Sequence, residues 1–147
     1  METKKSVYLA NHLGFSETGK IALKHLVSEL DKYFIVLEPF RDAGTIKDIT
    51  SHDAARAIII SNRMLMSRSN VMAPVLDGTH AIDDGIAAEI AEFASKRFGP
   101  IIALRSDLRH HDSKFRINPQ ILGYIKESGG KLCLSLVEWY SELKKYA

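Results

Sequence analysis

Residues 71–104 read VMAPVLDGTHAIDDGIAAEIAEFASKRFGPIIAL, and this stretch decides the fold because two apolar runs flank an amphipathic helical pattern. The runs Val71–Leu76 and Pro100–Leu104 have the length of buried β-strands. Between them, one face of a helix is marked by Ile86, Ile90, Phe93 and Arg97. A strand, a helix and a second strand predict a right-handed crossover that joins two parallel strands.

The same alternation of strand and helix patterns continues on both sides of this unit. Further strands are predicted at Val7–Ala10, Phe34–Leu37 and Leu132–Leu134. Helices are predicted around residues 23–30, 54–65 and 118–128, and after a capping box that opens at Ser135. The pattern predicts an α/β fold with a single doubly wound, five-stranded, mostly parallel sheet and helices on both faces, as in flavodoxin-like and Rossmann-like proteins. Pro74 lies inside the third strand, so we expect a local bulge there.

Length and composition narrow the classes of protein. The chain has 147 residues, which fits one domain over residues 1–147, and its 46% apolar and 26% charged residues are typical of a globular protein. A net charge of +2 argues against a dedicated nucleic-acid binder. The single cysteine, Cys133, allows no internal disulfide, and we expect an inert buried thiol in a reducing, cytoplasmic compartment. Without a signal core or a long apolar stretch, we expect neither secretion nor contact with a membrane.

Carboxylates gather where the third strand ends, at the edge of the sheet where open α/β folds bind ligands. Four of them fall between residues 77 and 89: Asp77, Asp83, Asp84 and Glu89. Glu89 lies at the margin of the apolar stripe, in the first turns of its helix. We therefore expect the helix N-terminus to keep Glu89 ionised in a partly desolvated cleft, as a nucleophile requires. The ordinary alternative is an exposed helical glutamate, preceded by two aspartates that only cap the helix.

Other polar groups favour no further site. The run His110-His111-Asp112 suggests a metal site only weakly, because adjacent side chains point apart, and we expect a solvated loop and no metal. Neither a G-x-G-x-x-G nor a P-loop motif occurs, so no dinucleotide or other cofactor is expected. Core packing is the predicted role of Met64, Met66 and Met72.

Several motifs occur together in a characteristic order. The stretch Asp83-Asp84-Gly85-Ile86-Ala87-Ala88-Glu89-Ile90 is close to the signature D-x-G-T-A-x-E-I-G. The other pieces are Val7–Ala10 with Gly14-Phe15, Glu38-Pro39-Phe40, Val75–Thr79, Ile101–Arg105 with Asp107, Asn118-Pro119-Gln120, and Ser128–Gly130 with Ser135-Leu136. On these motifs the chain resembles the nucleoside 2-deoxyribosyltransferase family, which also contains nucleotide N-glycosidases.

The resemblance implies a reaction and roles for single residues. It implies that Glu89 attacks C1′ of a 2-deoxyribonucleoside and expels the base, and that a second base attacks the resulting ester with overall retention. Tyr8 would orient Glu89, Asp83 would hold the sugar hydroxyls, and Asn118 would reach into the site of a neighbouring subunit. The expected partners are therefore a small-molecule nucleoside, a free base and further copies of the chain. Additional expected substrate-binding residues are Gly14, Phe15, Phe40, Asn62 and Asp77.

The sequence departs from the family pattern on the side of the base. Asn62 stands where the family has an aspartate that contacts the base and assists its protonation, and Asn70 replaces a second aspartate. An amide can hydrogen-bond a base but has no titratable proton to donate. If Asn62 binds the base, Asn62→Asp is expected to raise the transfer rate. Alternatively, another acid such as Asp77 serves the base.

Three alternatives to base exchange stay open at this point. Water can replace the second base, which gives hydrolysis of a nucleoside or a nucleoside 5′-monophosphate. Residues 11–14, Asn-His-Leu-Gly, offer few phosphate-binding groups, which favours the nucleoside. Because position 62 is an asparagine, another alternative is a family member that binds nucleosides without catalysis. A phosphoacceptor signalling domain is disfavoured, because Asn11 and His12 occupy the place where its acidic residues would stand.

Overall fold

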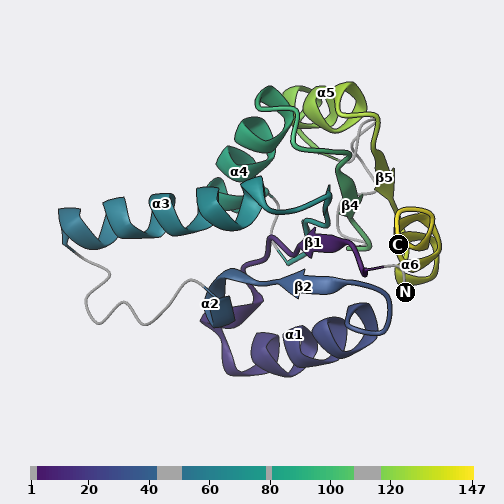
Figure 1. Ribbon diagram of the computed structural model, residues 1–147, viewed down its shortest axis with the longest axis horizontal. Helices are drawn as coiled ribbons and strands as arrows, with labels where there is room; N and C mark the ends of the chain where they lie inside the picture. Colours follow the sequence, from purple (N-terminus) through teal and green to yellow (C-terminus); the bar gives the residue numbers. More distant parts are fainter. Residues whose placement is uncertain (1–2, 43–50, 79–80, 108–116) are drawn as a thin grey trace.

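The structure is a computed structural model that describes residues 3–42, 51–78, 81–107 and 117–147 (Figure 1). Strands and helices alternate along the described chain. The strands are β1 (Ser6–Tyr8), β2 (Ile35–Leu37), β3 (Val71–Met72), β4 (Ile102–Leu104) and β5 (Lys131–Cys133). The helices are the 3-10 turn η1 (Leu13–Phe15), α1 (Glu17–Leu30), α2 (Pro39–Asp42), α3 (His52–Ser67), α4 (Asp84–Ser95), α5 (Pro119–Glu127) and α6 (Leu136–Lys144).

All paired strands are parallel, which confirms the predicted α/β class and strand direction. The regular ladders form two sheets, one with the order β2-β1-β3 and one with β4-β5. Two isolated bridges, Met72 with Ile101 and Val75 with Leu104, connect β3 and its continuation to β4. The single regular five-stranded sheet of the prediction is therefore interrupted between its third and fourth strands.

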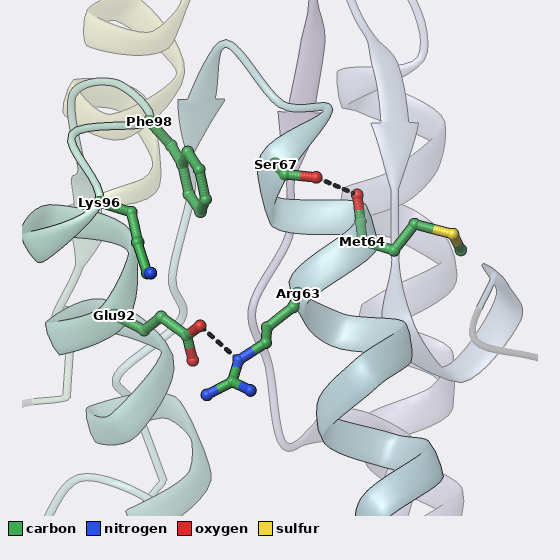
Figure 2. A pocket seen from close by; sticks show the side chains of 6 residues that line it. All are labelled: Arg63, Met64, Ser67, Glu92, Lys96 and Phe98. Atoms are coloured by element: carbon green, nitrogen blue, oxygen red, sulfur yellow. Dashed lines mark hydrogen bonds and ion pairs between the residues drawn. The ribbon is translucent and has the colours of Figure 1, made fainter.

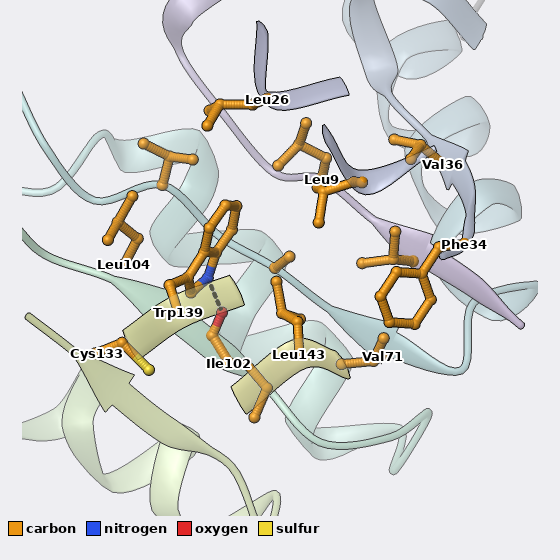
Figure 3. Packing of buried hydrophobic residues seen from close by; sticks show 14 of the residues in the cluster. Leu9, Leu26, Phe34, Val36, Val71, Ile102, Leu104, Cys133, Trp139 and Leu143 are labelled. Carbon is orange, nitrogen blue, oxygen red and sulfur yellow. Dashed lines mark hydrogen bonds between the residues drawn. The ribbon is translucent and has the colours of Figure 1, made fainter. Parts of the chain in front are cut away.

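Pro74 explains the interruption. The amides of Met72 and Leu76 donate to the carbonyls of Pro100 and Leu104, so the register would pair residue 74 with the carbonyl of Ile102. Proline has no N–H to donate. The indole Nε1 of Trp139 donates to that Ile102 carbonyl instead, at 2.7 Å, from helix α6 (Figure 3). A side chain thus satisfies the acceptor that the strand leaves free. The expectation of a bulge at Pro74 is wrong, because Met72 to Leu76 and Pro100 to Leu104 span the same number of residues, so the ladder loses one hydrogen bond without an inserted residue.

Two hydrophobic clusters lie on the two faces of the strands. One joins α1 and α6 to the strands and contains the fully buried Trp139 and Leu143 (Figure 3). The other joins α3, α4 and α5 to the strands and contains Tyr8, Ile90 and Phe93. Helices therefore cover both faces, as a doubly wound fold requires. Cys133 belongs to the first cluster, and burial raises the pKa of its thiol to about 11, in agreement with an unreactive cysteine.

Helix α3 differs from its prediction. It projects beyond the rest of the molecule (Figure 1), and the side chains it buries are Ala54, Leu65 and Met66. Met64 is 49% exposed, so its predicted place in the core is wrong, whereas Met66 and Met72 are buried as predicted. Met64 lies in the last turns of α3, but its side chain lines an open pocket and is not packed among the buried side chains as Leu65 and Met66 are.

Arg97 does not continue the stripe of Ile86, Ile90 and Phe93, because α4 ends at Ser95 and Arg97 has a φ of 54°. The run His110–Asp112 lies outside the described residues. None of the described helices combines the length and apolar character needed to cross a membrane.

Candidate active site

Tyr8 and Glu89 meet at the carboxyl end of β1. Tyr8 is the last residue of that strand and is fully buried. Helix α4 follows β3 and places Glu89, which is partly buried, above the same strand end. The Tyr8 hydroxyl donates a hydrogen bond to Glu89 Oε1 at 3.0 Å. The structure thus brings together two of the three residues for which the family resemblance implies catalytic roles.

Asn62 from α3 makes a second contact with the same carboxylate oxygen. Its Nδ2 donates to Glu89 Oε1 at 2.8 Å. Its other amide atom, Oδ1, is buried and meets no hydrogen-bond partner among the described residues. Glu89 Oε1 therefore receives two donors from two different elements, while Oε2 receives neither of them.

Burial raises the pKa of the Glu89 carboxyl to about 7. The hydrogen bonds from Tyr8 and Asn62 lower this pKa, whereas the negative charges of Asp83 and Glu38 raise it further. Contrary to the expectation from the helix N-terminus, the pKa of Glu89 lies above its ordinary value. Glu89 lies in the second turn of α4, beyond the free amides of the first turn, and loss of hydration has the larger effect. Burial and Glu89 also raise the pKa of the Tyr8 hydroxyl, which keeps it protonated as a donor.

Asp83 caps the helix that carries Glu89. Its Oδ1 accepts a hydrogen bond from the amide of Ile86 at 3.1 Å, which is the N-cap geometry expected from the sequence. Because the cap fixes the start of α4, it also fixes the height of Glu89 above the sheet edge. Asp83 is partly exposed, so its carboxylate lies within reach of a ligand at this edge.

Asp77 joins the ends of β3 and β4. Its Oδ1 accepts hydrogen bonds from the amides of Ser106 at 2.6 Å and Asp107 at 2.9 Å, and the Ser106 hydroxyl donates to its Oδ2. In return, the Gly78 amide donates to Asp107 Oδ2 at 3.2 Å. Gly78 has a φ of 104°, which favours glycine, and an added Cβ would lie 2.7 Å from His12 Nε2. The structure therefore places Asp77 in a loop-organising position at the sheet edge.

Three expected substrate-binding residues form one aromatic group beside β1 and β2. The rings of Phe15 and Phe40 pack edge to face, with centroids 4.8 Å apart. A Cβ at Gly14 would lie 2.4 Å from Cγ of Phe40, so this position accepts only glycine while the ring stays in place. Phe15 is 74% exposed and Phe40 42%, an unusual exposure for aromatic side chains that touch each other.

A buried polar pair supports this aromatic group, and no sequence motif indicates it. Asn11 and Glu38 are 7% and 2% exposed, and Asn11 Nδ2 donates to Glu38 Oε1 at 2.8 Å. Asn11 Oδ1 accepts from the amide of Leu13, and the Glu38 carboxylate accepts from the amides of Phe40 and Arg41. The available signal was positional, because both residues follow the ends of neighbouring parallel strands.

Asn118 is not among the residues that hydrogen-bond Glu89 in the described chain. It is exposed and caps α5, where its Oδ1 accepts from the amide of Gln120 at 2.9 Å. It takes no part in the contacts that join Tyr8, Asn62 and Glu89. A role of Asn118 in a site therefore depends on how copies of the chain assemble.

An open pocket of about 540 Å³ lies between α3 and α4 (Figure 2). It is lined by Arg63, Met64, Ser67, Glu92, Lys96 and Phe98. Arg63 Nε and Glu92 Oε1 form an ion pair at 2.5 Å across it. Arg63 follows Asn62, and Glu92 lies nearly one turn after Glu89, so this ion pair continues the α3–α4 contact away from Glu89. None of the site residues expected from the sequence lines this pocket.

A family model identifies the family of the chain, and two solved structures share its fold. Residues 7–134 match the family model described as "Nucleoside 2-deoxyribosyltransferase". A crystal structure of a conserved protein from Enterococcus faecalis V583 is similar with a TM-score of 0.79 and 22% identity, over 99% of this chain and 100% of that one. A 2-deoxyribosyltransferase from the psychrotolerant bacterium Bacillus psychrosaccharolyticus is similar with a TM-score of 0.70 and 14% identity, over 97% and 92%. No curated protein gives a significant sequence match.

Proposed function

The chain belongs to the nucleoside 2-deoxyribosyltransferase family, and on that premise we propose that it exchanges the base of a 2-deoxyribonucleoside through a covalent intermediate on Glu89. The observation that carries this proposal is the partly buried hydrogen bond from Tyr8 to Glu89 Oε1 at the carboxyl end of β1. A carboxylate held by a donor at a ligand-binding sheet edge is suited to attack a sugar carbon.

In the first step a Glu89 oxygen forms a bond to C1′ of the nucleoside. The C1′–N bond breaks, and its electron pair leaves with the base, which takes up a proton from water or from another residue. The absence of a 2′-hydroxyl eases formation of the oxocarbenium-like transition state. In the second step a nitrogen of the incoming base attacks C1′, the bond from C1′ to the Glu89 oxygen breaks to release the carboxylate, and the N–H proton of that base passes to water. Two displacements at one carbon retain its configuration.

The hydrogen bond from Tyr8 restricts the rotation of the carboxylate. Because Tyr8 donates to Oε1, the carboxylate can present Oε2 to C1′. Burial makes Glu89 a poorly hydrated and therefore more reactive anion once it has lost its proton. A pKa of about 7 leaves a substantial fraction ionised at neutral pH.

The remaining expected site residues serve the substrate. Asp83, at the start of α4, accepts hydrogen bonds from the sugar hydroxyls. The exposed rings of Phe15 and Phe40, held against Gly14, offer an apolar surface on which a base can stack. Asp77 contributes to binding through the loop that it organises at the ends of β3 and β4.

We also propose that the active form is a homo-oligomer in which Asn118 completes the site of a neighbour. Within its own chain Asn118 is exposed, and its side chain caps α5. The projecting helix α3 exposes three large apolar side chains, Ile59, Ile60 and Met64, by 44%, 61% and 49%. Clustered exposed apolar side chains of this size are typical of a surface that another chain covers.

The proposal is tested by incubating the protein with deoxyinosine or thymidine together with adenine or cytosine. Chromatography separates a new nucleoside, which base exchange predicts, from free base alone, which hydrolysis predicts. Glu89→Gln should remove turnover, whereas Glu92→Gln, on the same helix, should retain it. If neither nucleoside is consumed, the chain binds nucleosides without catalysis or has another substrate, and the proposal is wrong.

A further inference from the structure

We propose that Asn62 is a positioning residue that holds the Glu89 carboxylate, and not a residue that binds the departing base. The inference rests on the proposed function of Glu89 and deepens it. It also reverses the expectation for Asn62→Asp that the family resemblance gave.

Two donors from different elements hold the Glu89 carboxylate. Tyr8 from β1 and Asn62 from α3 both donate to Glu89 Oε1, at 3.0 Å and 2.8 Å. Two donors that approach one oxygen from a strand and a helix define the plane and the rotation of the carboxylate, which a single donor does not. Both leave Oε2 to the substrate, so the pair selects the attacking oxygen.

The orientation of the Asn62 amide also favours a contact with Glu89 over a contact with the base. Its Oδ1 is buried without a hydrogen-bond partner among the described residues, which is unfavourable for an acceptor. The reversed amide would place Oδ1 against Glu89 Oε1, where two acceptors repel each other. Glu89 therefore fixes the direction of the amide. The same burial prevents a base from reaching Oδ1 in this arrangement.

The charges around Glu89 explain why an amide suits position 62. Glu89 is faced by Tyr8 from β1, Asn62 from α3, Asp83 at the start of α4 and Glu38 at the end of β2. The two carboxylates raise the pKa of Glu89, and the two uncharged donors lower it. An aspartate at position 62 would replace one donor with a third negative charge. It would therefore favour protonated, unreactive Glu89.

The experiment follows the Glu89 carboxyl carbon by ¹³C NMR as a function of pH, in protein without substrate. Its resonance is assigned by its loss in Glu89→Gln. Asn62→Leu removes the donor and introduces an apolar side chain of similar volume. It should move the titration midpoint of Glu89 upward by about 0.5–1 pH unit. Asn62→Asp, which is isosteric with asparagine, should move it further. Tyr8→Phe removes the other donor and should also raise the midpoint.

Asn70→Asp is the matched control, because it adds the same charge just after α3. Asn70 uses Oδ1 to accept from the amide and hydroxyl of Ser6, and an aspartate can do the same. The Glu89 midpoint should stay at its original value in this variant. In kinetics, the acidic limb of kcat/KM should move with the NMR midpoint for Asn62→Leu and stay in place for Asn70→Asp.

Two results would overturn the inference. One is an unchanged Glu89 midpoint in both Asn62 variants. The other is a faster transfer by Asn62→Asp, greatest for poor leaving groups, which would return Asn62 to the base. If Asn62→Leu fails to fold, the isosteric aspartate variant decides. The NMR titration needs no turnover, so a protein that cleaves no nucleoside would refute the proposed function without obscuring the result for Asn62.

Discussion

At the scale of single residues, Glu89 has to be buried to react well and ionised to react at all. Because burial raises its pKa to about 7, Glu89 is both buried and partly ionised near neutral pH. Since attack requires the carboxylate, kcat/KM should rise with pH through about 7 and level off above it. The measurement is a pH–rate profile with a nucleoside whose base does not titrate in this range. A profile that stays flat or falls as the pH rises through about 7 would contradict the assigned role of Glu89.

The same residue should reduce stability when it is ionised. Its pKa rises from 4.5, its ordinary value, to about 7 in the folded protein, so the folded state holds the proton more tightly than the unfolded state. The free energy of unfolding therefore falls as the pH rises through this interval. Glu89→Gln, which can still accept from Tyr8 and Asn62, should recover about 1–3 kcal/mol at pH 8 and little at pH 4.5.

Urea denaturation at the two pH values measures this difference, with Glu92→Gln as the control on the same helix. Glu92 is paired with Arg63 at the surface, so its replacement should change stability by only a few tenths of a kcal/mol. A gain for Glu89→Gln that is larger at pH 4.5 than at pH 8 would show that burial does not destabilise the charged form.

At the scale of elements, the sequence predicted most where local pattern and burial agree. The stripe of Ile86, Ile90 and Phe93 is buried in α4, and it places Glu89 correctly at the margin of the core. The predicted capping roles of Asp83 and Ser135 hold as well, because a cap depends on residues within one turn.

Contacts between distant elements could not be read in this way. Asn62 and Glu89 are 27 residues apart on two helices, and no periodicity indicates that their side chains meet. The direction of the Glu89 pKa was also missed, because desolvation depends on everything packed around the group and not on its place in a helix. Met64 failed for the converse reason, since a helix face stays exposed where no neighbour covers it.

The irregular third strand leads to a prediction about stability. Trp139 Nε1 supplies the donor that Pro74 cannot give to the Ile102 carbonyl. Trp139→Phe should therefore cost about 1–3 kcal/mol for the unsatisfied acceptor, in addition to lost packing. In the Trp139→Phe background, Pro74→Ala provides an N–H at the missing ladder position. It should recover about 1 kcal/mol of that cost, as a double-mutant cycle measures.

The single variant Pro74→Ala provides the fourth corner of that cycle. In the presence of Trp139 its new N–H competes for an acceptor that is already bonded, so it should bring no comparable gain. Strictly additive effects of the two substitutions in urea denaturation would show that the indole does not substitute for the ladder hydrogen bond.

At the scale of the whole molecule, the proposed assembly can be tested by complementation. If Asn118 completes a neighbour's site, a mixed dimer of Glu89→Ala and Asn118→Ala protomers contains one site with both side chains intact. After denaturation and joint refolding, an equal mixture should regain about a quarter of the wild-type activity, because half of the dimers are mixed and each has one intact site.

The two variants refolded separately and then combined without exchange provide the control. An equal mixture that is no more active than the average of its separate components would contradict a shared site. So would a fully active monomer of 16.4 kDa in sedimentation.

The central claim, a covalent deoxyribosyl ester on Glu89, is tested most directly by mass spectrometry of the intact protein. The protein is mixed with a slowly exchanged 2-deoxyribonucleoside without acceptor base and quenched in acid. We expect an added mass of one deoxyribosyl group, which peptide mapping assigns to Glu89 and which is absent in Glu89→Gln. Release of base without any adduct in a single turnover, or an adduct on another residue, would contradict this claim.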